Sequence, residues 1–486
     1  MKIDLISYRA EPSAKGFYLV SDGWNDFGYR TYFNLYYFDG KKKTNIGGVK
    51  IATKDEQETT SLLDFLNGDT SNYFSLGQSK NFYLNLIKLG TVKKRFVLET
   101  LNDIAYNLEL FDEVKVLEIT KTSLLRDIPA LTVREQFNRI INNGLELTDY
   151  SFKFIREEDD LTLEFQINPS TMPPSNIHAI IGSNGVGKTT VLKQMITALI
   201  EKNNNYRFIN ELKDEHPIFA NVVFISFSAF DSGGYYADIK NENNENYYSY
   251  IGLKKEIKES IITKDIDSLS SEFSESIENI IKDEVFFESW KEAIDILEIE
   301  STLKKFDLKS IDKKSKKEKK ELFLSLSSGH KIIVLTLTRL IEKVNEKSLV
   351  LIDEPETHLH PPLLAAFMNA ISKILTQQNG VCILATHSPV VMQELNRACV
   401  SVLRRGHEKV TVNRPNIDTY GENVGILTRE VFSLEVTNTG FYRVLSEYVN
   451  KGKNYSEILE EFEDALGLEA RTILRTLLQE KMENNI

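Results

Sequence analysis

The residues best suited to chemistry lie together at positions 182–189, where the sequence reads Gly-Ser-Asn-Gly-Val-Gly-Lys-Thr. Glycines at this spacing before a lysine and a hydroxyl residue are typical of a loop whose backbone N–H groups surround phosphate oxygens. Lys188 would reach the β- and γ-phosphates of ATP, and Thr189 would take one position on Mg²⁺. The alternative is a chance glycine-rich turn. The predicted nucleotide-binding residues are Gly182, Ser183, Asn184, Gly185, Val186, Gly187, Lys188, Thr189 and Thr190.

Two carboxylates follow a second apolar segment. Residues 348–352 read Ser-Leu-Val-Leu-Ile, and Asp353 and Glu354 come next. A buried parallel strand would deliver both carboxylates to the carboxyl-terminal edge of its sheet, where ligands bind. We expect Asp353 to hold Mg²⁺ together with Thr189, and Glu354 to orient or deprotonate the attacking water. Desolvating adjacent carboxylates without a cation is costly, which favours this functional interpretation.

A histidine and a serine-rich segment complete the candidate chemistry. His387 follows the apolar segment 381–385. A lone histidine is usually structural, but this position at the same sheet edge favours contact with the γ-phosphate or the attacking water. Serines at 327–328 and Gly329 precede an apolar helix predicted at 331–341. They form either a plain N-cap or a second anion-binding site. These three residues are Ser327, Ser328 and Gly329.

For other polar residues, a structural role explains the sequence at least as well as a role in the site. The apolar strand predicted at 222–225 is followed by residues that either line the site or cap the strand: Ser226, Ser228 and Asp231. His358 and His360 are one residue apart without a third nearby ligand, so a tight loop entering a helix at Pro361 is favoured over a metal site.

Segments with strand and helix patterns must position these residues, and they divide the chain into five parts. Residues 1–145 form an accessory α+β domain, with strands at 17–20, 29–38 and 49–52, a turn at 39–42, and helices from 56 and at 96–108. The core halves are residues 146–231, which include an antiparallel pair at 150–155 and 161–167, and residues 326–430. Between them, residues 232–325 are an inserted, mostly helical lobe, with helices at 254–262, 275–281 and 286–297. Residues 431–486 are a helical tail.

The composition indicates a globular protein without membrane segments. The net charge is −12 over 486 residues, so the surface as a whole does not attract nucleic acid. The lysine-rich segment 304–320 is a local candidate for DNA contact, although an exposed helix or linker is the commoner meaning of such a run. Two cysteines give no disulfide framework. Since no signal peptide or spanning segment is visible, we expect a cytoplasmic location.

The order of the motifs resembles that of ABC-type ATPases. The phosphate loop is followed by LSSGH at 326–330, LVLIDEPE at 349–356 and ATHSP at 385–389. The spellings EPETHLHP and THSP are similar to those of the SMC-like and overcoming-lysogenization-defect branch. Similar ATPase subunits occur in the bacterial anti-phage systems Septu, PARIS and retron-linked operons. The chain departs from the pattern in having LSSGH for LSGGQ, and serines at 226 and 228 where a glutamine is usual.

This resemblance implies a P-loop NTPase fold of ABC type, with a mostly parallel sheet, a flanking antiparallel β-layer and a helical lobe. It also implies a homodimer, or higher oligomer, that closes around two ATP molecules. Lys188, Thr189, Asp353, Glu354 and His387 would act from one subunit. Ser327, Ser328 and Gly329 would clamp the nucleotide bound to the other subunit.

The first functional hypothesis is an ATP-driven regulator of an anti-phage system that controls a separately encoded effector. The tail shows no set of acidic residues typical of a nuclease, so if DNA is cut we expect another protein to cut it. A nuclease is therefore the first candidate for the effector. Two alternatives are a DNA repair or chromosome-maintenance ATPase, and a nucleotide-gated scaffold with little turnover. A membrane partner is not expected.

Overall fold

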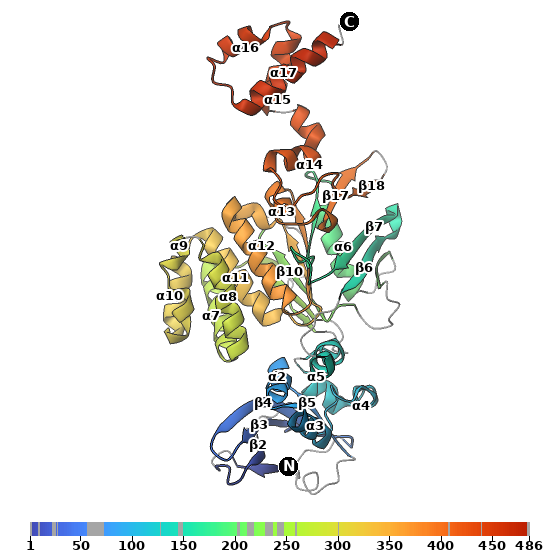
Figure 1. The fold of residues 1–486 in the computed structure, drawn as a ribbon, viewed down its shortest axis with the longest axis vertical. Coiled ribbons are helices and arrows are strands. Elements are labelled where there is room, and N and C mark those ends of the chain that lie inside the picture. The colour runs from blue at the N-terminus through green and yellow to red at the C-terminus, as the bar shows by residue number, and fades with distance from the viewer. Residues whose placement is uncertain are drawn as a thin grey trace.

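The computed structural model describes residues 2–7, 10–21, 26, 28–55, 72–126, 128–143, 149–201, 205–210, 218–228, 237–240, 247–257, 260–299, 301–406, 409–438 and 440–483. Figure 1 shows an N-terminal domain at one end of the molecule, a central α/β body, and a small helical bundle at the other end. The helix predicted from residue 56 and the candidate Asp231 lie outside the described residues.

The N-terminal domain is a five-stranded sheet covered by helices, with a hydrophobic core of its own. Asp39 accepts hydrogen bonds from the backbone N–H groups of Lys41 and Lys42, at 2.7 and 2.8 Å, and so fixes the predicted turn. The predicted hairpin is therefore confirmed. The strands, in spatial order, are β1 (Ile3–Ile6), β2 (Gly16–Ser21), β3 (Tyr32–Phe38), β4 (Lys43–Thr53) and β5 (Tyr73–Gly77).

The helices of this domain end earlier than the sequence pattern predicts. The helix predicted at 96–108 is wrong over its second half, because α3 stops at Thr100 and Asn102 takes a left-handed backbone conformation with φ of 46°. Asn107 then caps a separate helix through its side chain. The helical elements are α2 (Lys80–Lys88), α3 (Thr91–Thr100), α4 (Leu108–Val114), η1 (Thr120–Leu124), η2 (Thr132–Phe137) and α5 (Asn138–Asn143).

An eight-stranded sheet forms the centre of the α/β body. Its six inner strands are parallel to their neighbours, and one antiparallel strand closes each edge. The four central strands are mostly apolar and are buried along their whole length, because both faces of the sheet are covered there. The spatial order is β11 (Ile239–Lys240), β12 (Tyr247–Gly252), β10 (Asn221–Ser226), β15 (Leu349–Asp353), β16 (Val381–Thr386), β8 (Ile177–Ile181), β17 (Val400–Arg405) and β18 (Val410–Asn413).

A three-stranded antiparallel layer covers the helix that follows the phosphate loop, α6 (Lys188–Ile200). The strands are β7 (Leu161–Ile167), β6 (Tyr150–Arg156) and β9 (Tyr206–Asn210), and their inward residues form one core with α6. Along β6 and β7 every second residue is buried, which is the pattern of a sheet with one solvated face. The predicted antiparallel pair is confirmed.

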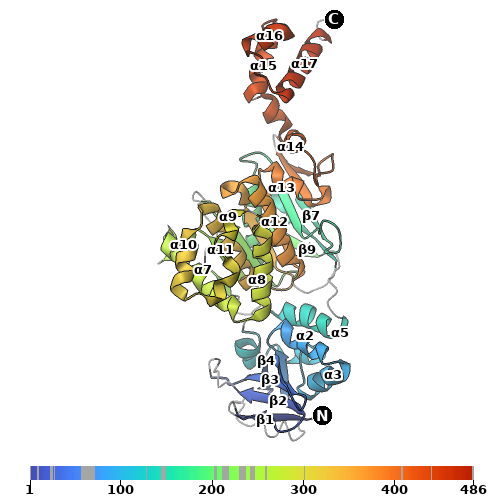
Figure 2. The ribbon, with the colours of Figure 1, turned by 60° about the vertical axis from the view of Figure 1, so that its left-hand side comes forward.

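The helical lobe packs on the other face of the sheet, as Figure 2 shows. The predicted helices at 275–281 and 286–297 are confirmed. The helix predicted at 254–262 is wrong: the chain forms a hairpin of β13 (Lys254–Ile257) and β14 (Ser260–Thr263), where three of four residues in β14 are β-branched and so favour a strand. The helices are α7 (Ile266–Ile281), α8 (Glu284–Leu297), α9 (Ser301–Lys304), η4 (Leu308–Lys313), α10 (Lys316–Ser325), α11 (Ser328–Lys343) and α12 (Pro361–Thr376).

The segment predicted as lobe also supplies two strands to the main sheet, since β11 and β12 lie within residues 232–325. This topology confirms the predicted α/β architecture: a mostly parallel sheet, an antiparallel β-layer, a helical lobe and an N-terminal α+β domain.

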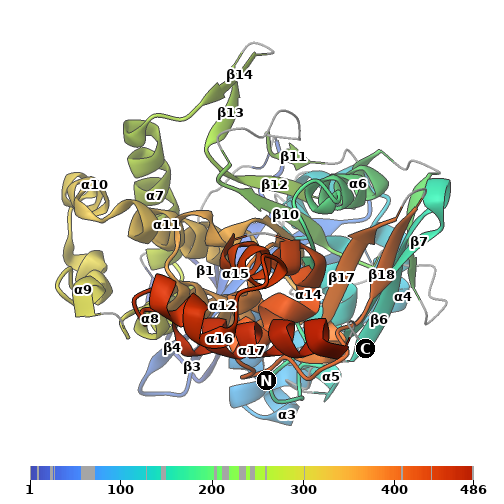
Figure 3. The ribbon, with the colours of Figure 1, turned by 90° about the horizontal axis from the view of Figure 1, so that it is seen from above.

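The C-terminal bundle is seen end-on in Figure 3 and has a small core of its own. It is reached through α13 (Pro389–Gln393), which packs against α14 (Val424–Asn438). None of the helices in the described part of the chain combines the length and apolar character needed to cross a membrane. The remaining helices are α15 (Gly440–Asn450), α16 (Tyr455–Glu461) and α17 (Leu468–Glu483).

Candidate nucleotide-binding site

The phosphate loop connects the end of β8 to the start of α6. Gly185 and Gly187 have φ of 76° and 105°, a left-handed conformation that glycine adopts without steric cost. A Cβ on Gly182 would lie 2.5 Å from the carbonyl oxygen of Leu403, so the first glycine permits a close approach to β17. The loop therefore ends at the free N–H groups of a 13-residue helix, which is an arrangement suited to phosphate.

Lys188 is buried and folds back over the loop. Its ammonium group donates hydrogen bonds to the carbonyl oxygens of Gly182 and Ser183, at 2.8 and 3.1 Å. The side chain is thus held at the loop, in the place where the sequence predicts phosphate contact. A buried ammonium is stabilised by an anion, which makes a phosphate group a favourable additional partner.

Thr189 and Asp353 meet across the sheet edge although 164 residues separate them. The Thr189 hydroxyl lies 2.9 and 3.0 Å from the two carboxylate oxygens of Asp353. Hydroxyl and carboxylate oxygens are the ligands that Mg²⁺ prefers, and Mg²⁺ usually takes its other ligands from phosphates and water. These two residues therefore fit the predicted ion, even though the described residues contain no cluster of three or more His, Cys, Asp or Glu that could hold a metal.

Glu354 is held in an unusual backbone conformation directly after β15. Its φ and ψ are 47° and 61°, in the left-handed region, and its N–H donates to the carbonyl oxygen of Ala385 at 2.9 Å. For a residue other than glycine this conformation costs about 1–3 kcal/mol and is most often found at functional sites. It turns the Glu354 carboxylate, which is about a third exposed, to within 3.8 Å of the His387 ring.

Glu356 is a further site residue, and the sequence patterns did not indicate a role for it. One of its oxygens accepts hydrogen bonds from the Thr386 hydroxyl and the His387 N–H, both at 2.7 Å, and lies 3.1 Å from His387 Nδ1. The other oxygen is buried and has no hydrogen-bond partner among the described residues. Glu356 therefore fixes His387 beside Glu354. One sequence feature could have indicated it: Glu356 follows Glu354 by two residues, directly after a buried strand.

The serine-rich segment forms the start of α11. Ser327 caps this 16-residue helix, accepting from the His330 N–H at 3.4 Å, and its hydroxyl lies 2.8 Å from His330 Nδ1. Ser327 and Ser328 are exposed, whereas Gly329 is buried against the loop η5 (Pro355–His358). A Cβ on Gly329 would come within 2.8 Å of the His358 carbonyl oxygen. The role of this helix start toward a second subunit stays a prediction.

Comparison with known proteins places this chain in a family. It is 37% identical over 505 residues to Protein ea59 of Escherichia phage lambda, and the match covers 96% of both chains. The chain belongs to the ea59 family.

A second comparison identifies part of the chain as an ATPase domain. Residues 200–393 match the family described as "AAA domain, putative AbiEii toxin, Type IV TA system", so this ea59-family chain carries an AAA-family ATPase domain. The matched span contains Asp353, Glu354 and His387, and the phosphate loop lies just before it.

Solved ATP-binding cassettes resemble the chain only weakly. CbiO1 from Clostridium perfringens, part of the ABC transporter complex cbiONQ, has 15% identity and a TM-score of 0.31, over 61% of this chain and 98% of that chain. UvrA2 from Deinococcus radiodurans has 14% identity and a TM-score of 0.30, over 62% of this chain and 43% of that chain. Overall likenesses at this level carry no argument about function.

The remaining polar candidates from the sequence are two serines after β10 and the two histidines before α12. Ser226 pairs in register with Asp353 on the adjacent strand, and its buried hydroxyl has no hydrogen-bond partner among the described residues. Ser228 is half-buried just beyond it. His360 caps α12 by accepting from the Leu363 N–H at 3.4 Å, which agrees with the loop interpretation of the two histidines.

The lysine-rich segment is largely paired within the helical lobe. Lys319 is almost fully buried and forms an ion pair with Glu278 at 2.5 Å, and Lys320 bonds to Ser271 at 2.8 Å. Lys309 pairs with Asp295 and Glu298. These contacts explain the charge run as a means of joining α10 to α7 and η4 to α8, and they give no specific support to DNA contact.

Proposed function

We propose that this ea59-family chain is an ATP-driven molecular switch that closes a homodimer around ATP and reopens after hydrolysis. The observation that carries the proposal is the hydrogen bond between Thr189 and Asp353. It joins the phosphate loop to the acidic edge of β15, where Glu354 and His387 also lie. Phosphate binding, metal binding and activation of water are therefore possible in one place.

Each residue of the site has a chemical role in this proposal. Lys188 exchanges its loop carbonyl contacts for phosphate oxygens, while Thr189 and Asp353 hold Mg²⁺. The ion, when bound, neutralises charge on the phosphate oxygens. Glu354 accepts the proton of the attacking water at its carboxylate, and His387 hydrogen-bonds the γ-phosphate or that water. Glu356 keeps the imidazole of His387 in position.

A second copy of the chain would complete the site. Ser327 and Ser328 are exposed at the start of a long helix, whose free N–H groups favour an anion. The order of the motifs supports one anion at this helix start, the γ-phosphate of the ATP held by a partner subunit. ATP would then act as part of the dimer interface, and hydrolysis would weaken that interface.

We further propose that the switch regulates a separately encoded effector, with a nuclease as the first candidate, in defence against phages. The relative at 37% identity belongs to phage lambda, which is consistent with a gene carried by phages or prophages and acting on competing phages. The N-terminal domain and the C-terminal bundle offer surfaces outside the ATPase core for sensing and docking. A cytoplasmic location follows from this role.

Two variants test the ATPase part of the proposal. Lys188→Ala should lose ATP binding, whereas Glu354→Gln should bind ATP, hydrolyse it slowly and accumulate as a dimer. Unchanged turnover in either variant would refute the site assignment. Negligible turnover in the unmodified protein would favour a nucleotide-gated scaffold, and turnover strongly stimulated by DNA would favour a DNA-maintenance ATPase.

The regulatory part needs its own experiment. The chain should be co-expressed with the product of the neighbouring gene and purified with and without ATP. We expect a stable complex that depends on the nucleotide state, and protection of cells against phage that is lost with Lys188→Ala. Absence of both the complex and the protection would contradict the regulatory role.

A further inference from the structure

A cavity of about 410 Å³ lies between the N-terminal domain and the ATPase body. It sits at the amino-terminal edge of the parallel sheet, because its wall includes the first residue of β10, early residues of β12 and the residues that follow α11. The phosphate loop and Asp353 are at the opposite edge of the same sheet. The volume falls within the range of ordinary small-molecule sites, about 300–1,000 Å³.

The N-terminal domain supplies the other wall, from α2 and η2. Figure 2 shows α2 and α5 directly beneath the helical lobe and the sheet. The two sides are joined by specific bonds: Gln136 donates to Gln378 at 2.8 Å, and Asn81 donates to Asp283 at 3.4 Å. A molecule in this cavity would therefore contact both the N-terminal domain and the ATPase body.

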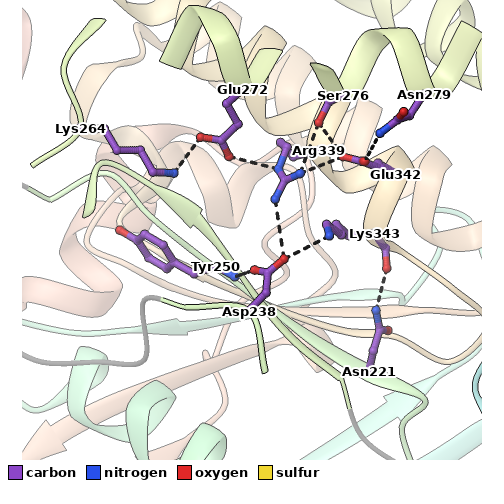
Figure 4. A network of polar contacts seen from close by, with 10 residues as sticks. All are labelled: Asn221, Asp238, Tyr250, Lys264, Glu272, Ser276, Asn279, Arg339, Glu342 and Lys343. Carbon is purple, nitrogen blue, oxygen red and sulfur yellow. Dashed lines mark hydrogen bonds and ion pairs between the residues drawn. The ribbon is translucent and has the colours of Figure 1, made fainter. Parts of the chain in front are cut away.

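The acidic groups at this cavity are all engaged by the protein. Asp238 pairs with Lys343 at 3.1 Å and lies 4.0 Å from Arg339, and Glu342 pairs with Arg339 at 2.8 Å, as Figure 4 shows. Asp283 caps α8 by accepting from the N–H groups of the first turn. Each of these carboxylates therefore already accepts hydrogen bonds or ion pairs from the protein.

Lys80 is the exception to this pairing. It lines the cavity from the first turn of α2 and forms no hydrogen bond or ion pair with any residue that the structure describes. Burial lowers the pKa of its ammonium group, although Glu346 and Asp283 act in the opposite direction from a distance. Withdrawing an ammonium group from water without a hydrogen-bond or ion-pair partner is costly, and an anion in the cavity would offset that cost.

The rest of the wall suits an oxyanion. Amide side chains, which can donate hydrogen bonds to oxygen, surround the cavity together with three aromatic residues. The amides are Gln78, Asn81, Gln136, Asn221, Asn345 and Gln378, and the aromatic residues are Phe137, Tyr248 and Phe286.

We propose that this interdomain cavity binds a small metabolite that carries a phosphate or carboxylate group, with Lys80 as its ionic partner. The two groups share the chemistry of an oxyanion, and experiment can distinguish them. Binding here adds an effector site to the protein and is independent of ATP hydrolysis.

The position of the cavity gives the ligand a route to the nucleotide site. Residues 344–348 join α11, which begins at Ser328, to β15, which ends at Asp353. The N-terminal domain binds this connection through two ion pairs, Arg139 with Glu346 at 2.8 Å and Glu135 with Lys347 at 3.0 Å. A ligand that tightens the two parts would therefore act on the connection between the signature helix and the metal-binding strand. This regulatory consequence rests on the proposed function.

Binding can be measured on the full chain by thermal unfolding with two probes, inorganic phosphate and succinate. We expect at least one probe to raise the melting temperature of the unmodified protein and of the control Lys313→Met, and to bind Lys80→Met at least tenfold more weakly. Phosphate can also bind the phosphate loop, so the effect must persist in Lys188→Ala. The inference is overturned if neither probe binds, or if binding survives Lys80→Met and disappears in Lys188→Ala.

The variant itself is expected to fold. Lys80→Met removes a half-buried charge that forms no ion pair with a described residue, so the melting temperature without anion should equal or exceed that of the unmodified protein. Lys80→Gln, which keeps polarity but not charge, should show the same loss of probe binding. ATP turnover separates the two claims: loss of probe binding with basal turnover unchanged supports the cavity without depending on the proposed function.

Discussion

Replacing Glu356 by glutamine tests whether this carboxylate positions His387 for hydrolysis. A single Glu356 oxygen accepts from the Thr386 hydroxyl and the His387 N–H, and lies 3.1 Å from the His387 ring. A hydrogen bond to a charged group is worth about 1.5–3 kcal/mol and a neutral one about 0.5–1.5 kcal/mol, so the amide, which keeps the geometry and loses the charge, should weaken the interaction by about 1–1.5 kcal/mol. If that difference acts in the transition state, turnover should fall about 5- to 13-fold.

The assay is single-turnover ATP hydrolysis with nucleotide affinity measured in parallel. Because the bonds of Glu356 run to Thr386 and His387, kcat should fall while ATP affinity stays within about twofold of the unmodified protein. Glu113→Gln, an exposed carboxylate of the N-terminal domain, is the control and should leave turnover unchanged.

A double-mutant cycle decides whether Glu356 acts through His387. In a His387→Asn background, Glu356→Gln should cause little further loss, because the group that it positions is already absent. Full additivity of the two losses, or a Glu356→Gln variant as active as the unmodified protein, would refute this reasoning.

Three further predictions concern stability and coupling. Arg139→Met removes the cation that bonds to Glu346, a carboxylate that is 1% exposed and whose pKa is raised by burial. The free energy of unfolding in urea should fall by about 3–5 kcal/mol, whereas removing an exposed ion pair by Arg95→Met should lower it by about 0–1 kcal/mol. Equal losses in the two variants would contradict the importance of the buried pair. Burial raises the pKa of Asp103 to about 6, so the folded state binds the proton more tightly than the unfolded state. The free energy of unfolding should therefore fall by about 3 kcal/mol as pH rises from about 4 to 6. Urea unfolding of Asp103→Asn should lack this pH dependence. Gly329→Ala places a methyl group against the His358 carbonyl and should slow ATP turnover, while Gly467→Ala, with open space around it, should not.

The sequence predicted the elements whose signals are local. The strands ending at Asp353 and at Thr386 are short apolar segments followed by polar residues, a pattern that survives in the structure because parallel strands are buried on both faces. The phosphate loop and its helix have the same local character. The hairpin at 254–263 was misread as a helix because charged and apolar residues alternate irregularly there, and the β-branched residues of β14 decided the outcome.

The contacts that could not be predicted join distant parts of the chain. Glu356 gains its role from Thr386 and His387, some 30 residues later, and this meeting depends on the order of β15 and β16 in the sheet. Arg139 and Glu346 are 207 residues apart, so the docking of the N-terminal domain leaves no local pattern. The lysines near 319 are neutralised by carboxylates on another helix, which a charge run by itself does not reveal.

The most direct measurement of the central claim is a structure of Glu354→Gln with ATP and Mg²⁺. We expect two chains facing each other, with the γ-phosphate beside Lys188, the ion between Thr189 and Asp353, and Ser328 of the second copy against the same nucleotide. Nucleotide located away from Lys188 and Asp353, or Ser328 facing solvent in the ATP-bound assembly, would contradict it.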